Sequence, residues 1–480
     1  MILNELLDGM ETVEITGDIS CDVTGIVYDS RHVEPGALFV ALPGEKTDGS
    51  VYVEDAIQRG AAAVVSQAPC AFGGSFPCIH VADARLAMAH LAGRFYKHPA
   101  TRLCTIGITG TNGKTTVSFM LREIFKAAGR RPGLLGTVRY EIGDRVLPAS
   151  RTTPEAPDIQ AMFAQMDRVG CDSAIMEVSS HALAQHRVDG ILYDAAVFTN
   201  LTQDHLDYHG TLEEYFNVKS RLFNQVRRFA VINRDDLWGR RLLNDKKFIA
   251  GRVSYGFEEG AEVRGGNPVT DTNGSRMSVQ SPWGHVEVTL QLIGRFNLYN
   301  ALAAFAAAAA LGIPVPIIVK ALGEMHCVPG RLEAVPNTKG KRVFVDYAHT
   351  DDALLNVLET LRAITPGRLI VVFGCGGNRD KGKRPLMGKI AARIADYSII
   401  TNDNPRNEVP EKIAAEITAG FDSERKYEII LDRKAAIARG LGLIGKKDVL
   451  LIAGKGHETY QEFNGVIVPF DDREAVQESF

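Results

Sequence analysis

The pattern of apolar and polar positions alternates between short apolar runs and longer segments with helical spacing. Between residues 99 and 328, apolar runs at 103–108, 173–176, 195–199 and 229–233 are separated by such segments. Strands that are buried on both faces of a parallel sheet read as continuous apolar runs, so this alternation predicts a largely parallel sheet covered by helices. Ligands are then expected at the carboxyl ends of the strands.

Two further regions flank this sheet. The first has short β-rich pieces at 25–28 and 37–42, Pro-Gly and Asp-Gly turns, and one helical stretch near 52–59. The second repeats the alternation, with apolar runs at 343–346, 369–373, 398–401, 428–431 and 449–453. We therefore predict an α/β protein of three domains: a small N-terminal α/β domain (1–98), a central, mostly parallel sheet (99–328) and a C-terminal Rossmann-like domain (329–480).

Length, charge and cysteine content narrow the class of protein. A chain of 480 residues is too long for one core, and its net charge of −4, with both signs mixed, argues against binding to nucleic acid or to a membrane surface. Seven cysteines without C-x-x-C spacing disfavour a disulfide framework and a zinc site. The chain begins without a signal-peptide pattern, and the alanine-rich stretch 301–313 is too short to span a bilayer. We expect a cytoplasmic protein in which that stretch is a buried helix.

A glycine-rich segment follows the first apolar run of the central region and leads into a helical pattern. Its residues are Gly110, Thr111, Asn112, Gly113, Lys114, Thr115 and Thr116. Backbone N–H groups at a helix start attract phosphate, Lys114 supplies a positive charge, and the Thr115 hydroxyl is suited to Mg²⁺. The match to G-x-x-x-x-G-K-[ST] is imperfect, because Gly107 lies one residue too far from Gly113. We predict ATP as the ligand, against the alternative of an ordinary glycine-rich turn.

Polar residues follow the next two apolar runs. Glu177 comes directly after the run at 173–176, and His205 lies in a polar block after the run at 195–199. Alone, such a glutamate is usually a helix cap and such a histidine a solvated loop residue. Together at adjacent strand ends, close to the glycine-rich loop, they could hold Mg²⁺ against ATP oxygens. Lys219, on a predicted helix, reads from the sequence as a surface lysine.

Seven motifs together resemble the ATP-dependent Mur ligases of peptidoglycan synthesis over the whole chain. They are Gly110-Thr-Asn-Gly-Lys-Thr-Thr116, Glu177-Val-Ser-Ser-His181, Thr199-Asn-Leu with Asp204-His-Leu-Asp-Tyr-His209, Gly294-Arg-Phe-Asn297-Leu-Tyr-Asn300, Asp346-Tyr-Ala-His349, Asp403-Asn-Pro-Arg406 and Lys455-Gly-His-Glu458. Asp29-Ser30-Arg31, Pro35-Gly-Ala-Leu-Phe39 and Asp48-Gly49 resemble the family's uridine-nucleotide domain, which folylpolyglutamate synthases lack. Asp351 stands where the family usually has proline, for which we expect a local turn change without loss of function.

The resemblance implies a cytoplasmic ligase of cell-wall biogenesis, and with it roles in cell shape and cell division. The D-Glu carboxylate of UDP-N-acetylmuramoyl-L-alanyl-D-glutamate would be phosphorylated by ATP with Mg²⁺, and the acyl phosphate would react with meso-diaminopimelate. A monomer that contacts neither nucleic acid nor membrane is expected. The alternatives are the same ligase using L-lysine, a folylpolyglutamate-type ligase, and a non-catalytic nucleotide-binding protein, against which the intact catalytic set argues.

The resemblance also implies a role for individual residues. Catalysis would rest on Lys114, Glu177, His205 and Lys219, and the metal ligands would be Thr115, Glu177, His205 and Lys219 as a carbamate. Adenine and ribose would be bound by Asn297, Asn300, Asp346 and His349. The UDP-sugar peptide would contact Tyr28, Ser30, Glu45, Lys46, Thr47, Thr152, Thr153, Ser179, Gln185 and Arg187. Diaminopimelate would be bound by Arg379, Asp403, Asn404, Pro405, Arg406, Gly454 and Glu458. Without the family, these residues would be interpreted as helix caps, turn residues and solvated charges.

Overall fold

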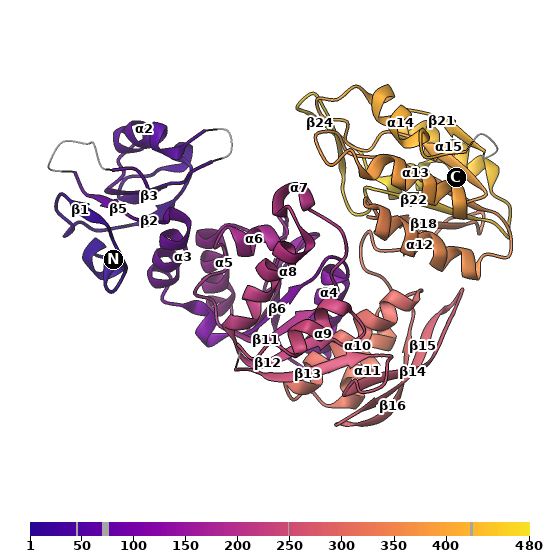
Figure 1. The fold of residues 1–480 in the computed structure, drawn as a ribbon, viewed down its shortest axis with the longest axis horizontal. Helices are drawn as coiled ribbons and strands as arrows, with labels where there is room; N and C mark the ends of the chain where they lie inside the picture. The colour runs from indigo at the N-terminus through magenta and orange to yellow at the C-terminus, as the bar shows by residue number, and fades with distance from the viewer. Residues whose placement is uncertain (45–46, 70–75, 248, 423–425) are drawn as a thin grey trace.

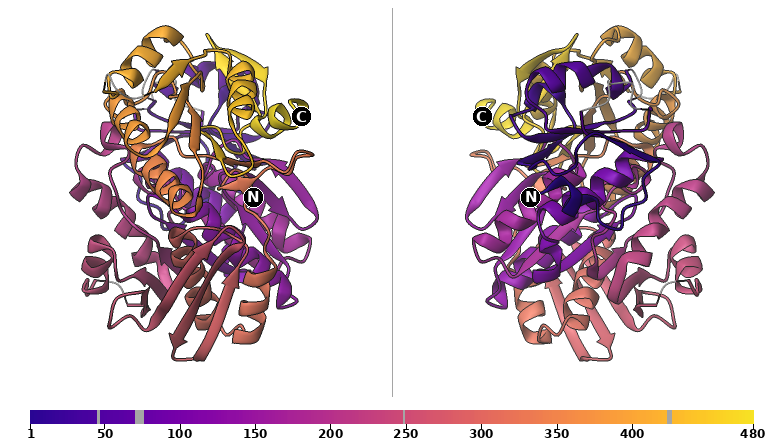
Figure 2. Two further views of the ribbon diagram at one scale, coloured as in Figure 1. Left: turned by 90° about the vertical axis from the view of Figure 1, so that its right-hand side faces the viewer. Right: turned by 90° about the vertical axis from the view of Figure 1, so that its left-hand side faces the viewer.

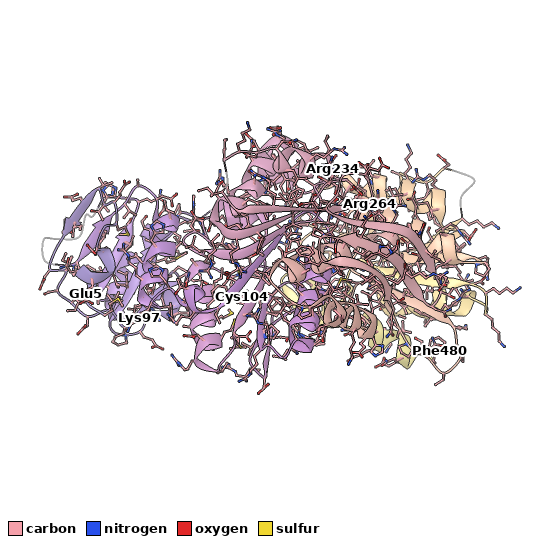
Figure 3. All side chains as sticks on the ribbon, turned by 90° about the horizontal axis from the view of Figure 1, so that it is seen from below. Glu5, Lys97, Cys104, Arg234, Arg264 and Phe480 are labelled. Atoms are coloured by element: carbon pink, nitrogen blue, oxygen red, sulfur yellow. The ribbon has the colours of Figure 1, made fainter. Side chains whose placement is uncertain are left out.

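The computed structural model describes residues 1–44, 47–69, 76–247, 249–422 and 426–480. It is an α/β protein in which three sheets of five, eleven and six strands follow one another along the chain, which confirms the predicted fold class. The N-terminal region lies at one end of the molecule, and the C-terminal region lies beside the central sheet (Figure 1). Seen from below, Glu5 and Lys97 lie at one end, Cys104 further in and Phe480 at the other end (Figure 3).

The N-terminal sheet has the order β1-β5-β4-β3-β2 and is parallel except for β1. Its strands are β1 (Glu14–Thr16), β2 (Gly25–Val27), β3 (Ala37–Ala41), β4 (Ala63–Ser66) and β5 (Cys78–His80). Its helices are α1 (Leu3–Leu7), η1 (Ser30–His32), η2 (Gly49–Tyr52), α2 (Val53–Gln58) and α3 (Ala84–Phe95). Every residue of β3 and β4 is buried, because helices cover both faces of the sheet.

The central sheet has the order β16-β15-β14-β13-β12-β11-β6-β10-β7-β8-β9. Its strands are β6 (Cys104–Thr109), β7 (Pro132–Leu135), β8 (Arg139–Ile142), β9 (Arg145–Pro148), β10 (Ser173–Glu177), β11 (Tyr193–Phe198), β12 (Val226–Asn233), β13 (Gly251–Gly256), β14 (Val263–Asp271), β15 (Gly274–Ser281) and β16 (Gly284–Leu290). The sheet is parallel from β7 through β14, as the apolar runs predict. At both edges it continues as antiparallel hairpins, which the apolar runs do not predict.

Helices cover both faces of the central sheet. They are η3 (Pro99–Arg102), α4 (Lys114–Ala127), α5 (Ala156–Arg168), α6 (Ser180–Ala184), α7 (Leu206–His209), α8 (Leu212–Ser220), η4 (Arg221–Gln225), α9 (Leu237–Leu243), α10 (Arg295–Ala310) and α11 (Val315–Glu324). One core packs α4, α10 and α11 against the sheet, and a second packs α5, α6 and α8 against the other face. The alanine-rich helix α10 is buried from Ala301 to Ala309, as predicted.

The C-terminal sheet has the order β17-β18-β22-β19-β20-β21 and is parallel except for β17. Its strands are β17 (Glu333–Ala334), β18 (Arg342–Asp346), β19 (Leu369–Phe373), β20 (Tyr397–Ile400), β21 (Tyr427–Ile429) and β22 (Val449–Ala453), and a separate hairpin joins β23 (Tyr460–Phe463) to β24 (Val466–Pro469). The helices are α12 (Asp351–Ile364), α13 (Lys383–Ile394), α14 (Pro410–Thr418), α15 (Arg433–Leu443) and α16 (Asp472–Glu478).

The two end views show how the three regions are arranged. The N-terminal and C-terminal regions lie on one side of the molecule, and the β14–β16 strands lie on the opposite side (Figure 2). Across the described ranges, no helix combines the length and the apolar character that crossing a membrane requires. Cys78 is disulfide-bonded, which the cysteine spacing does not predict, whereas Cys21, Cys104, Cys171, Cys327 and Cys375 are free thiols.

Candidate active site

The glycine-rich loop lies between β6 and α4, and no side chain fits at its two glycines. Gly110 and Gly113 have φ angles of 145° and 88°. A Cβ atom would lie 1.9 Å from Thr199 Oγ1 at Gly110 and 2.4 Å from Asn300 Oδ1 at Gly113. The chain can therefore turn tightly from the end of a buried strand into a helix N-terminus, where free N–H groups and the helix dipole favour an anion.

Lys114, the first residue of α4, folds back over this loop. Its Nζ donates hydrogen bonds to the carbonyl oxygens of Gly110 and Thr111, both at 2.8 Å. Burial lowers the pKa of Lys114, and the nearby Glu177 carboxylate partly opposes that shift. Phosphate oxygens would be stronger partners than neutral carbonyls, because hydrogen bonds between two charged groups are the stronger kind.

Glu177 ends β10, in register with Ile108 of β6, and its side chain is fully buried. Its Oε1 accepts a hydrogen bond from the Thr137 backbone N–H at 2.9 Å. Its Oε2 accepts from the hydroxyls of Thr115 at 3.0 Å and Thr137 at 2.9 Å. The structure thus places a carboxylate whose two oxygens both accept hydrogen bonds directly beside the Thr115 hydroxyl of the glycine-rich loop.

Lys219 lies on α8 and is not a surface residue, contrary to the interpretation from sequence. Only 1% of it is exposed, and its Nζ donates to the Gly110 carbonyl at 2.9 Å and lies 4.5 Å from the Tyr215 ring centroid. Burial, followed by the charge of Lys114, lowers the pKa of Lys219 well below its usual value. Both effects favour the neutral amine over the ammonium.

His205 precedes α7 with a left-handed backbone (φ 53°). Its ring lies 4.8 Å from the ring of His181, and its Nε2 lies 3.4 Å from an oxygen of Asp204. Burial lowers the pKa of His205 to about 4, so that the imidazole is neutral near pH 7. Within the described part of the chain, no three His, Cys, Asp or Glu side chains form a group that could hold a metal ion by themselves.

The side chains of Lys114, Glu177 and His205 line a cavity of about 570 Å³ between the central and C-terminal regions, whereas Gly110 and Lys219 do not line it. Of the predicted ATP and catalytic residues, it is lined by Thr111, Asn112, Gly113, Lys114, Thr115, Thr116, Glu177, His205, Asn300, Asp346 and His349. Asn297 does not line the cavity, but its Oδ1 accepts a hydrogen bond at 3.2 Å from Nδ2 of Asn300, which does. The Asp346 carboxylate accepts from the N–H groups of Leu332 at 2.6 Å and Ala348 at 2.7 Å, so it also shapes the surrounding turns.

Sequence reasoning missed two residues that link the C-terminal region to this loop. Arg331 Nη2 donates to Thr115 Oγ1 at 3.1 Å, and its guanidinium lies 4.8 Å from the Tyr347 ring centroid, with Nε buried and unpaired. Asp352 accepts from Asn112 Nδ2 at 2.9 Å. The signal for Arg331 was its place directly after Pro-Gly at the junction of two predicted domains. Asp352 carried no comparable signal.

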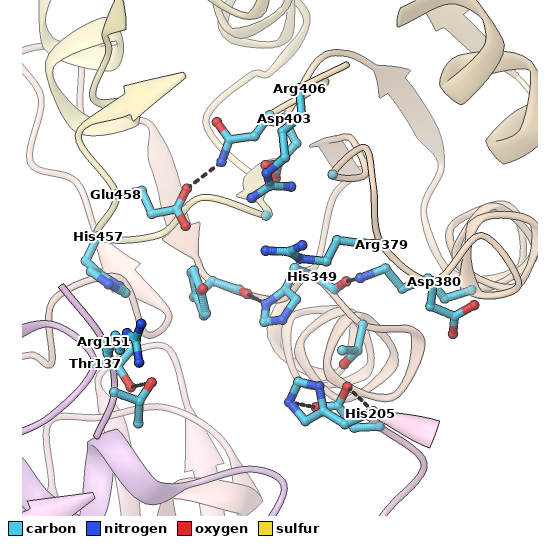
Figure 4. A pocket seen from close by; sticks show the side chains of 18 of the residues that line it. Thr137, Arg151, His205, His349, Arg379, Asp380, Asp403, Arg406, His457 and Glu458 are labelled. Carbon is cyan, nitrogen blue, oxygen red and sulfur yellow. Dashed lines mark hydrogen bonds and ion pairs between the residues drawn. The ribbon is translucent and has the colours of Figure 1, made fainter. Parts of the chain in front are cut away.

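A second cavity, of about 670 Å³, adjoins the first between the same two regions. Both cavities are lined by Thr137, Thr152, Asp204, His205, Tyr347, His349 and Thr350. Figure 4 shows Arg406, Asp403 and Glu458 on one side of the second cavity, His205, Thr137 and Arg151 on the other, and Arg379 and His349 between them. Of the predicted diaminopimelate residues, it is lined by Arg379, Asp403, Asn404, Arg406, Gly454 and Glu458. Pro405 is buried and does not line this cavity.

The C-terminal side of this cavity is held by polar contacts. Asn404 Nδ2 donates to Glu458 Oε2 at 3.0 Å, and the buried Lys455 Nζ donates to both Asn404 Oδ1 at 3.1 Å and Glu458 Oε2 at 2.9 Å. Arg406 has a left-handed backbone (φ 53°), and its Nε donates to Glu462 at 3.1 Å. A Cβ on Gly454 would lie 2.6 Å from the Asp403 carboxylate, so glycine permits their close packing.

The predicted UDP-sugar-peptide residues of the central region form one hydrogen-bonded group. Thr152 Oγ1 lies 3.0 Å from Thr137 Oγ1. Thr153 Oγ1 donates to the Glu177 carbonyl at 2.8 Å and accepts from the Ser179 N–H at 3.0 Å, while Ser179 caps α6. Arg187 donates to Gln185 Oε1 at 2.6 Å and to the Thr153 carbonyl at 3.0 Å.

Of the predicted uridine residues of the N-terminal region, the three that the structure describes line neither cavity. Tyr28 donates to Asp158 of the central region at 2.7 Å, Ser30 is buried, and Thr47 is exposed. Glu45 and Lys46 lie outside the described residues. Asp351, where the family usually has proline, is the first residue of α12 after the Thr350 cap. Proline and acidic residues both suit that position, so a regular helix start replaces the expected turn change.

Comparison with known proteins covers nearly the whole chain. Family profiles match as "Mur ligase family, catalytic domain" at residues 22–96, "Mur ligase middle domain" at 108–308 and "Mur ligase, glutamate ligase domain" at 330–456. The chain is 45% identical over 480 residues to the UDP-N-acetylmuramoyl-L-alanyl-D-glutamate--2,6-diaminopimelate ligase of Caldanaerobacter subterraneus subsp. tengcongensis, covering 100% of this chain and 98% of the relative. It is 42% identical over 508 residues to the ligase of the same name from Geobacter sulfurreducens, covering 100% and 99%.

Solved structures also match this chain over most of its length. A structure of a ligase of that name matches with a TM-score of 0.71 and 34% identity, covering 100% of this chain and 98% of the other. The Mycobacterium tuberculosis folylpolyglutamate synthase complexed with ADP and AMPPCP matches with a TM-score of 0.64 and 19% identity, covering 76% and 91%. The second match shows a likeness of fold alone.

Proposed function

The chain belongs to the Mur ligase family, and we propose that it joins meso-diaminopimelate to UDP-N-acetylmuramoyl-L-alanyl-D-glutamate in an ATP-dependent reaction of peptidoglycan synthesis. The observation that carries the proposal is the junction of two cavities, one at a glycine-rich phosphate loop and one at a pair of arginines. The name shared by full-length relatives above 40% identity supports the choice of substrates. Both cavities are built from one chain, so we propose that a monomer carries out the reaction, in the cytoplasm.

The first step activates the substrate carboxylate. An oxygen of the D-Glu carboxylate attacks the γ-phosphorus of ATP, the bond to ADP breaks, and an acyl phosphate forms. Both reactants are anionic, so the site has to offset their repulsion. Lys114 does this at the loop, with its ammonium released from the two carbonyls that hold it, and the Arg331 guanidinium lies beside Thr115 to assist.

Mg²⁺ fits the oxygen donors on the floor of this site. The Thr115 hydroxyl and the Glu177 carboxylate lie 3.0 Å apart, and hard oxygen ligands are what Mg²⁺ prefers. His205 lines the same cavity, and the remaining ligands would come from ATP, since the described side chains alone form no complete group. When bound, the ion neutralises negative charge on the phosphates.

We propose that Lys219 acts as a carbamate. Only a neutral amine adds to carbon dioxide, and burial together with the charge of Lys114 depresses the pKa of Lys219. The nitrogen bonds to the carbon of carbon dioxide and releases a proton. The resulting carbamate would be an anionic oxygen ligand next to Gly110 of the phosphate loop, where the unmodified amine donates a hydrogen bond.

Replacing Lys219 with arginine or methionine is expected to lower turnover tenfold to a hundredfold or more, the range for losing a metal-site partner. Arginine keeps the positive charge and methionine keeps the approximate length, but neither forms a carbamate. Because the side chain is buried, arginine is also expected to lower stability by about 1–3 kcal/mol through overpacking. Steady-state rates and thermal melts measure both effects, with Lys126→Arg on the exposed side of α4 as the control. A fully active arginine variant would leave Lys219 only a role as a cation.

The second step forms the amide. The amine nitrogen of diaminopimelate attacks the acyl carbon, inorganic phosphate leaves, and the nitrogen loses a proton. We propose that Glu458, Asn404 and Asp403 orient the amino-acid end, while Arg406 and Arg379 bind the distal carboxylate, since a guanidinium matches a carboxylate bidentately. All five line the cavity that adjoins the phosphate loop.

The product of the reaction tests the proposal. The protein is mixed with ATP, Mg²⁺, UDP-N-acetylmuramoyl-L-alanyl-D-glutamate and equal amounts of meso-diaminopimelate and L-lysine, and products are identified by mass spectrometry. We expect ADP, phosphate and the diaminopimelate adduct in equal amounts. A lysine adduct would move the assignment to the lysine-adding ligases, and turnover only with a folate substrate and glutamate would move it to the folylpolyglutamate type.

A further inference from the structure

Two loops that carry the arginines of the second cavity leave neighbouring strands. The first, residues 374–382, follows β19 and carries Arg379, and the second, residues 401–409, follows β20 and carries Arg406. β19 and β20 are parallel and paired from Ile370 to Phe373, so both loops emerge at the same edge of the sheet. The distance between the two arginines therefore depends on how these loops are fixed to each other.

The two loops contact each other closely through backbone and side-chain atoms. The Gly377 N–H donates to the Asn404 carbonyl at 2.9 Å, and Arg406 Nη1 donates to the Gly377 carbonyl at 2.9 Å. A Cβ on Gly377 would lie 1.8 Å from the Pro405 carbonyl oxygen, so the loops touch where only glycine fits. The Asn407 N–H donates to Asn378 Oδ1 at 3.1 Å. Arg406 is thus already tied to the loop that carries Arg379.

One carboxylate, that of Glu408, joins both loops to the helix behind them. Its Oε1 accepts from the Asn378 N–H at 2.6 Å and from Arg384 Nη2 at 3.1 Å, and its Oε2 accepts from Arg384 Nη1 at 3.0 Å. The Arg384 side chain, on α13, is fully buried and also donates to Glu416 of α14 at 2.6 Å. Arg384 holds the pKa of Glu408 at about 2, so this carboxylate is ionised throughout the working range of pH.

Asn378 is the residue most dependent on this contact. It has a left-handed backbone, with φ 54°, and its N–H and side-chain oxygen are both held by the second loop, by Glu408 and by Asn407. A left-handed conformation at a residue other than glycine persists when surrounding contacts fix it. Arg379 follows directly and is exposed, so the backbone at Asn378 sets where its side chain starts.

We propose that Glu408 is a positioning residue that sets the spacing of Arg379 and Arg406 and thereby the preference for an amine substrate with a distal carboxylate. This inference rests on the proposed function. Glu408 itself does not line the cavity, so it acts through the two arginines. Two guanidiniums at a fixed spacing bind a carboxylate at a lower entropic cost than two mobile ones.

The test compares two glutamates that bind the same buried arginine. Glu408→Gln loses the charge that fixes Asn378 and Arg384, whereas Glu416→Gln removes the same charge from Arg384 but touches neither loop in the contacts described. For Glu408→Gln we expect KM for meso-diaminopimelate to rise about tenfold to a hundredfold, the scale of losing a hydrogen bond to a charged group. Its KM values for ATP and lysine, and kcat at saturating diaminopimelate, should change little. Glu416→Gln should keep the wild-type preference.

A second variant covers the case in which Glu408→Gln folds poorly. Asn378→Gly keeps the left-handed backbone accessible and removes only the hydrogen bond to Asn407, so KM for diaminopimelate should rise about fivefold, the worth of one hydrogen bond. Equal losses with diaminopimelate and lysine, or unchanged selectivity in both loop variants, would overturn the positioning role. A wild-type enzyme that makes no diaminopimelate product would instead overturn the proposed function, so the two failures are distinguishable.

Discussion

Replacing Lys114 with alanine is expected to lower kcat by roughly a hundredfold to a thousandfold, the scale of losing one preorganised electrostatic donor. The ammonium is the first charged group of α4, and its two present partners are neutral carbonyls of the same loop. It can therefore pass to a phosphate without breaking an ion pair. In the transition state a phosphoryl group passes between two anions, so this state depends on the cation more than the bound ground state does. We therefore expect kcat to fall by a larger factor than KM for ATP rises.

The Lys114 variant also shows whether activity is lost at the reaction step or through unfolding of the protein. Lys114 contributes only two hydrogen bonds within its loop, each worth about 1 kcal/mol, so the melting temperature should fall by a few degrees at most. Lys126→Ala, an exposed lysine on the same helix, serves as the control and should leave kcat unchanged. Ligase activity equal to wild type in the Lys114 variant would remove the glycine-rich loop from the mechanism.

The parallel parts of the fold could be predicted because strands that are buried on both faces appear in the sequence as apolar runs. In the central sheet, β6, β10 and β11 are each built around an apolar run, and each is almost entirely buried. Parallel strands also fix where their carboxyl ends lie, so Glu177 could be expected close to the glycine-rich loop. These predictions used only neighbouring residues in the sequence and required no knowledge of distant contacts.

The antiparallel edges of the same sheet could not be predicted in this way. β14 contains Gly265, Gly266 and Pro268, which are typical of loops, and most of its outer half is exposed. Its pairing with β15 supplies the hydrogen bonds and the buried partners, such as Val279, that stabilise it as a strand. Strand formation there depends on tertiary contacts that outweigh the local preference.

The same limit applies to the site. Lys219 has the sequence context of a surface lysine on an amphipathic helix, and only the packing of α8 against the phosphate loop buries it. Arg331 reaches Thr115 across more than two hundred residues of chain, so no spacing rule joins them. The role proposed for Arg331 rests on the cavity that it lines, and that of Lys219 rests on its contact with Gly110. The roles proposed for Gly110 and Lys114 rest on a local turn.

Arg406→Ala is expected to cost about 2–5 kcal/mol in transition-state binding with meso-diaminopimelate, the scale for breaking a buried, hydrogen-bonded charge pair. The guanidinium lines the second cavity and is held in place through Nε by Glu462 and through Nη1 by Gly377. Lysine lacks the distal carboxylate, so it offers this guanidinium no anionic partner in addition to Glu462 and should be a poor substrate. The variant should therefore lose most of its preference for diaminopimelate.

The measurement is kcat/KM for both amines at saturating ATP and UDP-sugar dipeptide. Arg393→Ala, an exposed arginine of α13 that pairs with Glu359, is the matched control and should keep the wild-type ratio. KM for ATP and for the UDP-sugar should hardly move in the Arg406 variant, because the residues that we propose for those substrates lie in the N-terminal and central regions or line the other cavity. Equal wild-type rates with both amines would show that Asp403-Asn-Pro-Arg406 does not select the substrate. The phosphate loop, Glu177 and the ligase chemistry would be unaffected by that result, since none of them contacts the distal end of the amine.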